Sequence, residues 1–191
     1  MNIRRKTGRR SGVETALWGR ILRASRRAGS KSSFMDMTWL TDRIAIGGAI
    51  WRLDNMTELP RMGVTHVINM QSEFDDGPLA DACGVDLLWN AIDDDFLPKP
   101  PEVFSRGVEF ATNALRQEGS KVYIHCAAGV HRAPMMTLAL LCAQGMELLE
   151  AVYLIESRRP VAEFPDVYLE SVRAYLKSEL CPRQERRIWS R

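Results

Sequence analysis

The chain has 191 residues, of which 46% are hydrophobic and 26% are charged. This length suits one domain with a hydrophobic core, and the composition excludes a chain that is disordered throughout. No run of about 18 consecutive apolar residues is present, which excludes a typical transmembrane helix. The cysteines at positions 83, 126, 142 and 181 form neither a Cys-x-x-Cys pair nor a zinc-type cluster. We therefore expect no metal site and a reducing, cytoplasmic compartment.

The charged side chains are divided unevenly along the chain, although the net charge is only +2. Residues 1–35 have ten basic side chains and one acidic one, residues 36–180 have twelve basic and 22 acidic ones, and residues 181–191 have four basic and one acidic one. The acidic middle argues against a nucleic-acid partner, because the folded face of a nucleic-acid-binding domain is usually positive. The pattern predicts a basic N-terminal extension over residues 1–35, an acidic domain over 36–180 and a basic C-terminal tail over 181–191.

The N-terminal extension itself has two parts. Residues 1–12 are rich in arginine and nearly free of apolar side chains, which predicts a disordered segment. In residues 13–28, apolar side chains recur at helical spacing on one face, and arginines occupy the opposite face. Three interpretations stay open: an amphipathic helix in peripheral contact with an anionic membrane, a transit peptide, or a solvated tail.

From residue 36 onward, strand-like and helix-like segments alternate. Apolar runs predict strands over residues 44–48, 64–70, 86–92 and 121–126. Periodic apolar positions between glycine and proline residues predict helices over 53–62, 78–83, 100–118, 132–144, 147–158 and 165–180. Such alternation indicates an α/β fold, namely a single compact domain with a mostly parallel central sheet and helices on both faces.

One segment, with the sequence YIHCAAGVHRAP, contains the residue types that phosphate chemistry requires. Cys126 ends a strand, five residues follow, and Arg132 begins a helix. The backbone N–H groups of such a loop, together with the positive end of the helix, form a cradle for a tetrahedral oxyanion. Arg132 can bind two phosphate oxygens at once, and the same positive field favours the thiolate of Cys126, which is a nucleophile.

The spacing of cysteine and arginine is not specific by itself, since Cys181 and Arg187 have the same spacing. That second copy has no glycine in its loop and no strand before it, so we interpret it as coincidence. The first copy has both features, and His125 precedes its cysteine. The predicted phosphate-binding loop consists of Ala127, Ala128, Gly129, Val130, His131 and Arg132.

The sequence His125-Cys126-x5-Arg132 resembles the signature of the cysteine-dependent protein tyrosine phosphatase superfamily, specifically its compact dual-specificity branch. The resemblance covers about residues 36–180 and includes the strand at 63–70, an aspartate-bearing loop at 93–95 and the SRRP segment at 157–160. It implies a protein tyrosine phosphatase-like fold and a metal-independent phosphatase that needs no cofactor and works through a phosphocysteine intermediate. The implied partner is a protein carrying phosphotyrosine, phosphoserine or phosphothreonine.

The resemblance also implies a general acid in the aspartate loop and a structural role for the histidine before the cysteine. The family's spacing to an aromatic residue in the next helix, here Phe104, fits Asp94 best, and Asp93 is the alternative acid. One carboxyl group can protonate the leaving group and later activate water. We expect His125 to organise the loop.

One position departs from the family pattern. Ala133 stands where the family usually has serine or threonine, and some plant glucan phosphatases also have alanine there. The missing hydroxyl group predicts slow hydrolysis of the phosphocysteine. Three alternatives stay open: a lipid phosphatase of the phosphatidylglycerophosphate type, which the basic segment at 13–28 could bring to a membrane, a phosphoglucan phosphatase, and a phosphate-binding pseudophosphatase without catalysis, which Ala133 supports.

Overall fold

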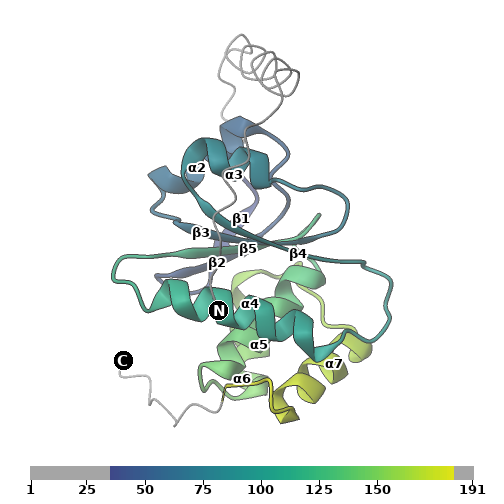
Figure 1. The fold of residues 1–191 in the computed structure, drawn as a ribbon. Coiled ribbons are helices and arrows are strands. Elements are labelled where there is room, and N and C mark those ends of the chain that lie inside the picture. The colour runs from purple at the N-terminus through teal and green to yellow at the C-terminus, as the bar shows by residue number, and fades with distance from the viewer. Residues whose placement is uncertain (1–34, 183–191) are drawn as a thin grey trace. The chain divides into compact units, whose positions relative to one another are not determined.

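The computed structural model describes residues 35–182, so the predicted helix at 13–28 and most of the basic C-terminal tail lie outside the described residues. Within this part of the chain, five strands form one sheet in the order β1-β2-β5-β3-β4 (Figure 1). The strands are β1 (Met37–Trp39), β2 (Ile44–Gly47), β3 (His66–Gln71), β4 (Asp86–Ile92) and β5 (Val122–His125). Strand β1 is antiparallel to β2, and the other neighbouring pairs are parallel. The predicted mostly parallel sheet is confirmed.

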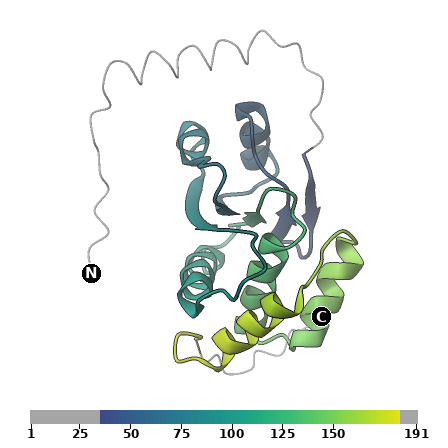
Figure 2. The same cartoon turned by 90° about the vertical axis from the view of Figure 1, so that its right-hand side faces the viewer.

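Helices cover both faces of this sheet (Figures 1 and 2). Helices α2 (Leu53–Arg61) and α3 (Gly77–Cys83) lie on one face. The other face is covered by α4 (Pro101–Leu115), α5 (Arg132–Ala143), α6 (Leu148–Arg158) and α7 (Asp166–Lys177). Helix α5 is buried from Arg132 to Leu141 because it packs against α4, α6, α7 and the sheet, which explains why its sequence is apolar on all sides.

The structure differs from the sequence-based expectation at the edges of elements. Strand β1 was not predicted, because three half-buried residues at the edge of a sheet give too short a pattern. Helix α7 ends at Lys177 rather than at residue 180, since Ser178 already has extended backbone angles. No helix within residues 35–182 has both the length and the apolar character needed to cross a membrane.

Strand β5 lies in the middle of the sheet, between β2 and β3. Its last residue, His125, is level with Gly47 of β2 and with Asn69 of β3. The loops that follow these parallel strands therefore start at the same edge of the sheet. In open α/β sheets, ligands bind outside this carboxyl edge, and the loop between β5 and α5 is placed there.

Candidate active site

The loop between β5 and α5 wraps around the sulfur of Cys126. This cysteine is 1% exposed, and the backbone N–H of Gly129 donates a hydrogen bond of 3.2 Å to its Sγ. Gly129 has a φ of +65°, a backbone conformation that side chains other than glycine rarely adopt. A Cβ at this position would lie 2.5 Å from Arg159 Nη2 and from the Gly47 carbonyl oxygen, so only glycine lets the loop turn this tightly.

The carbonyl oxygens on the outer side of the loop are held by Arg159, a residue for which the sequence analysis gave no role. Its Nε donates to the carbonyl of Gly129 at 2.8 Å, and its Nη2 donates to the carbonyl of Ala128 at 3.0 Å. Two further bonds, of 2.7 and 2.8 Å, reach the carboxylate of Asp36. Arg159 thus fixes the orientation of two peptide groups in the loop.

Arg132 lies at the start of α5 with a side chain that is 2% exposed. Its Nη1 and Nη2 donate to the two carboxylate oxygens of Glu73, each at 2.8 Å, and Nη1 also donates to the carbonyl of Ile92 at 3.0 Å. Nε has no hydrogen-bond partner, and the nearest carboxylate oxygen, Asp94 Oδ2, is 3.6 Å away. The guanidinium is therefore anchored to Glu73 through Nη1 and Nη2, and the edge that carries Nε has no hydrogen bond through that atom.

The ion pair between Arg132 and Glu73 keeps both groups charged. Burial opposes the charge of Arg132, but the bond to Glu73 and the nearby sulfur of Cys126 outweigh it, so that the pKa of Arg132 is raised. The same bond to Arg132 is the main reason why the pKa of Glu73 is lowered. Sequence reasoning missed Glu73, because it follows β3 and comes near the loop only through the pairing of β3 with β5.

The three consecutive aspartates after β4 have three different environments. Asp93 accepts a bond of 2.6 Å from the hydroxyl of Ser72. Asp95 pairs with the ammonium of Lys99 and caps the backbone N–H of Leu97. Asp94 alone of the three lies against the phosphate-binding loop, where its Oδ2 is 3.1 Å from Nδ1 of His131. The structure thus places Asp94, the predicted general acid, beside Arg132. The hydrogen bonds of Asp93 and Asp95 are made to residues outside the phosphate-binding loop.

His125 is fully buried below the loop. Its Nε2 lies 2.9 Å from Oδ2 of Asp76, which is also fully buried, and Asn69 donates to the other oxygen of Asp76 at 2.7 Å. The ring of Tyr123 stacks on the imidazole with a centroid distance of 5.4 Å. These contacts link the end of β5 to β3 and to the segment before α3, and they give His125 no path to a substrate.

The rest of the predicted loop is partly open. Ala128 is exposed, Ala127, Val130 and His131 are half-buried, and Gly129 is buried. Within residues 35–182, no group of three or more His, Cys, Asp or Glu side chains is arranged to hold a metal ion. The chemical groups gathered at the site are a thiol, a guanidinium, a carboxyl and backbone N–H donors, which suit an anionic tetrahedral substrate.

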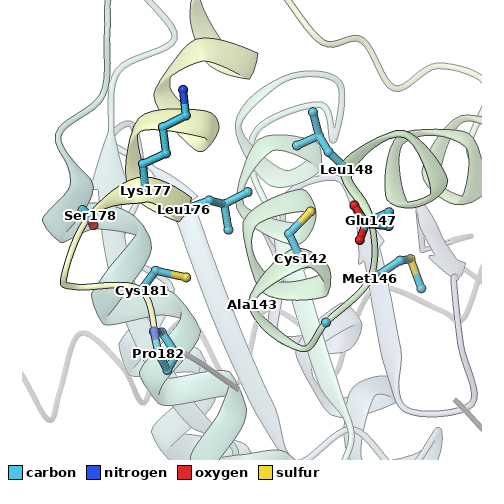
Figure 3. A pocket seen from close by; sticks show the side chains of 11 residues that line it. Cys142, Ala143, Met146, Glu147, Leu148, Leu176, Lys177, Ser178, Cys181 and Pro182 are labelled. Atoms are coloured by element: carbon cyan, nitrogen blue, oxygen red, sulfur yellow. The ribbon is translucent and has the colours of Figure 1, made fainter. Parts of the chain in front are cut away.

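A cavity of about 470 Å³ lies at the opposite end of α5 (Figure 3). Cys142, which lines it, is ten residues beyond Arg132, so the cavity is about 15 Å along the helix from the phosphate-binding loop. Burial raises the pKa of Cys142 to about 12 and also raises the pKa of Cys181, which lines the same cavity. Both thiols are therefore protonated at neutral pH, unlike a nucleophilic cysteine.

Comparisons with known proteins agree with this geometry. The family model described as "Dual specificity phosphatase, catalytic domain" matches residues 53–177. Dual specificity protein phosphatase 26 from Homo sapiens is 32% identical over 111 residues, which are 56% of this chain and 53% of that protein. Protein phosphatase Slingshot homolog 3 from Homo sapiens is 29% identical over 144 residues, which are 74% of this chain and 21% of that protein. The chain thus spans about half the length of the first relative and about a fifth of the second.

Solved structures show the same fold. A crystal structure of PTPMT1 in complex with PI(5)P aligns with a TM-score of 0.67 at 23% identity and covers 74% of this chain and 95% of that chain. A crystal structure of human DUSP28 aligns with a TM-score of 0.65, also at 23% identity, and covers 73% of this chain and 92% of that chain. These structures share the fold of this chain, and the family model matches most of the described residues, so the chain belongs to the dual-specificity phosphatase family.

Proposed function

We propose that this chain hydrolyses phosphomonoesters on proteins through a phosphocysteine formed at Cys126. The observation that carries this proposal is the buried Nε of Arg132, which has no hydrogen-bond partner and belongs to the residue that ends the loop around Cys126. A buried donor without an acceptor costs about 1–3 kcal/mol, and a phosphate oxygen in the loop would supply that acceptor. A thiolate below the bound phosphorus would then be the nucleophile.

The proposed catalytic cycle has two steps. In the first, the thiolate of Cys126 forms a bond to phosphorus, the bond between phosphorus and the leaving oxygen breaks, and Asp94 donates its proton to that oxygen. In the second, water attacks phosphorus, Asp94 accepts a proton from the water, and the bond between phosphorus and sulfur breaks. Inorganic phosphate leaves, the thiolate is regenerated, and Asp94 is again protonated.

The test is hydrolysis of p-nitrophenyl phosphate by the full chain in excess chelator. We expect the wild type to turn over and Cys126→Ser to be inactive. We expect Asp94→Asn to lose about 10²–10⁴-fold in kcat, because Asp94 also accepts the proton of the attacking water in the second step. Cys142→Ser and Asp93→Asn are matched controls, because each replaces the same residue type away from the predicted chemistry. An Asp93→Asn variant that loses more activity than Asp94→Asn would transfer the acid role to Asp93. A wild type that binds vanadate without turnover would favour the pseudophosphatase alternative.

The choice of a protein substrate rests on relatedness. Two of the related proteins are a dual specificity protein phosphatase and a protein phosphatase of the Slingshot type. We therefore expect the highest kcat/KM for phosphopeptides when these are compared with phosphatidylglycerophosphate in vesicles and with phosphoglucan. A higher kcat/KM for the lipid or the glucan would replace the protein assignment and leave the cysteine mechanism intact.

A further inference from the structure

His131, the last residue of the phosphate-binding loop before Arg132, contacts two other loops of the site. Its Nδ1 lies 3.1 Å from Oδ2 of Asp94, and its Nε2 lies 3.3 Å from Oε2 of Glu163. The side chain of His131 is 18% exposed, that of Asp94 27% and that of Glu163 70%. Because a contact made in water contributes little, the contact with Asp94 is the stronger of the two.

The carboxyl group of Asp94 is held from both of its oxygens. Tyr168 donates its hydroxyl hydrogen to Oδ1 at 3.0 Å, and burial raises the pKa of Tyr168 to about 12, so this phenol remains a donor at neutral pH. Oδ2 faces His131 and, at 3.6 Å, Nε of Arg132. Once Nε of Arg132 binds a phosphate oxygen, Arg132 no longer faces Oδ2. Since Tyr168 bonds the other oxygen, His131 is then the side chain of these three that holds Oδ2.

The backbone of the aspartate loop needs such support. Phe96 has a φ of +56°, which is strained for a residue with a side chain. Its N–H donates to the hydroxyl oxygen of Tyr168 at 3.1 Å, and its ring lies edge-on to His131 with a centroid distance of 5.2 Å. Tyr168 and His131 therefore hold both the carboxyl group of Asp94 and the strained residue that comes two positions later.

We propose that His131 is a positioning residue that, through its Nδ1, holds the carboxyl group of Asp94 over the phosphate-binding loop and toward the leaving-group oxygen. This inference rests on the proposed role of Asp94 as the proton donor. It concerns the orientation of Asp94, whereas binding of the phosphate depends on the loop backbone and on Arg132.

Leaving groups of different basicity test the inference. A p-nitrophenolate leaves with little help from a proton, whereas a phenolate needs one, so misplacing the acid penalises phenyl phosphate more than p-nitrophenyl phosphate. For His131→Ala we expect a loss of less than about 3-fold in kcat/KM on p-nitrophenyl phosphate and of about 30-fold in kcat/KM on phenyl phosphate, because kcat/KM reports the step in which the leaving group departs; the larger loss is part of the factor that a positioned acid supplies. In His131→Asn, the amide nitrogen replaces Nδ1, and this variant should regain most of the kcat/KM on phenyl phosphate.

The control is His66→Asn, which alters a histidine that pairs with Asp86 at the amino ends of β3 and β4, away from the site. This variant should keep the wild-type ratio of kcat/KM on the two substrates at pH 7.5. Equal losses of kcat/KM on both substrates in His131→Ala, or a His131→Asn variant with no higher kcat/KM on phenyl phosphate than His131→Ala, would overturn the inference. A wild type that hydrolyses neither substrate would instead refute the proposed function.

An NMR measurement, which requires no turnover, tests the contact between His131 and Asp94 directly. The side-chain ¹H–¹⁵N resonances of His131 should shift when Asp94 is replaced by asparagine and should stay unchanged when Asp93 is replaced. Resonances of His131 that do not respond to Asp94→Asn would overturn the inference even if the enzyme is active.

Discussion

At the scale of single residues, the sulfur of Cys126 accepts a hydrogen bond from the backbone N–H of Gly129, whereas the residue after Arg132 has no side-chain donor to offer it. That residue is Ala133, which is fully buried in the first turn of α5 and has no hydroxyl group. The family's usual serine or threonine here supports the thiolate as it leaves phosphorus. Since the bond between phosphorus and sulfur must break in the second step, alanine leaves that step with less stabilisation.

We therefore predict that turnover is limited by hydrolysis of the phosphocysteine. Rapid mixing with p-nitrophenyl phosphate should give a burst of one p-nitrophenol per enzyme, followed by slower steady-state release. Ala133→Ser should raise the steady-state kcat by about ten-fold, because a hydrogen bond to a charged group contributes about 1.5–3 kcal/mol. The burst should shrink in that variant. Wild-type progress curves without a burst would show that the first step limits turnover.

At the scale of elements, Arg159 connects the end of α6 with the phosphate-binding loop and with Asp36, which precedes β1. Its side chain is 4% exposed, and its donors satisfy two loop carbonyls as well as a carboxylate. Arg159→Met should lower the free energy of unfolding by about 2–3 kcal/mol, because these carbonyls lose a charged donor. It should also weaken inhibition by inorganic phosphate several-fold.

The adjacent Arg158 provides the control for this prediction, since it has the same chemistry but an exposed side chain. Arg158→Met should change the free energy of unfolding by less than about 0.5 kcal/mol. Chemical denaturation and inhibition by phosphate, measured on both variants, show whether the hydrogen bonds of Arg159 matter. Equal effects of the two substitutions would mean that Arg159 acts on stability and phosphate binding only through its positive charge.

The amino ends of β3 and β4 give the fold a pH dependence through His66. Burial lowers the pKa of His66 more than the carboxylate of Asp86 raises it. The unfolded chain then binds a proton more readily than the folded chain, so stability is lost as the pH falls below the ordinary value of 6.5 toward the lowered value. We predict that His66→Asn removes this part of the loss. Urea denaturation at pH 7.5 and 5.5 measures it, and parallel losses in both proteins would contradict the prediction.

How much the sequence could predict follows from whether a feature is local. The four parallel strands, the helices and the loop from Cys126 to Arg132 were predictable, because apolar periodicity and the cysteine motif are read from neighbouring residues, whereas the short strand β1 was not. The contacts of Glu73, Asp36 and Tyr168 were not, since their partners lie 59, 123 and 74 positions away in the chain. The pairing of the strands, including the antiparallel β1, and the packing of α6 and α7 bring them to the site.

At the scale of the whole molecule, charge is separated between the body and the ends. Residues 36–180 have 22 acidic and twelve basic side chains, whereas residues 1–35 have ten basic side chains and one acidic one. An anionic membrane repels such a body, so any attraction to it must come from the basic ends. We propose that residues 13–28 provide a peripheral contact of this kind.

We predict that the full chain sediments with vesicles containing phosphatidylserine but not with neutral vesicles. Replacing Arg20, Arg23, Arg26 and Arg27 by glutamine should weaken this binding by more than about 100-fold, because each basic side chain near an anionic surface contributes about 1 kcal/mol. The turnover of p-nitrophenyl phosphate should stay unchanged, since these residues precede the domain that contains the site. The matched control replaces the four arginines of the C-terminal tail by glutamine, namely Arg183, Arg186, Arg187 and Arg191. Both segments are basic, so the two variants show which of them binds the membrane. If the substitutions in the tail abolish sedimentation and those in residues 13–28 do not, the tail is the membrane contact.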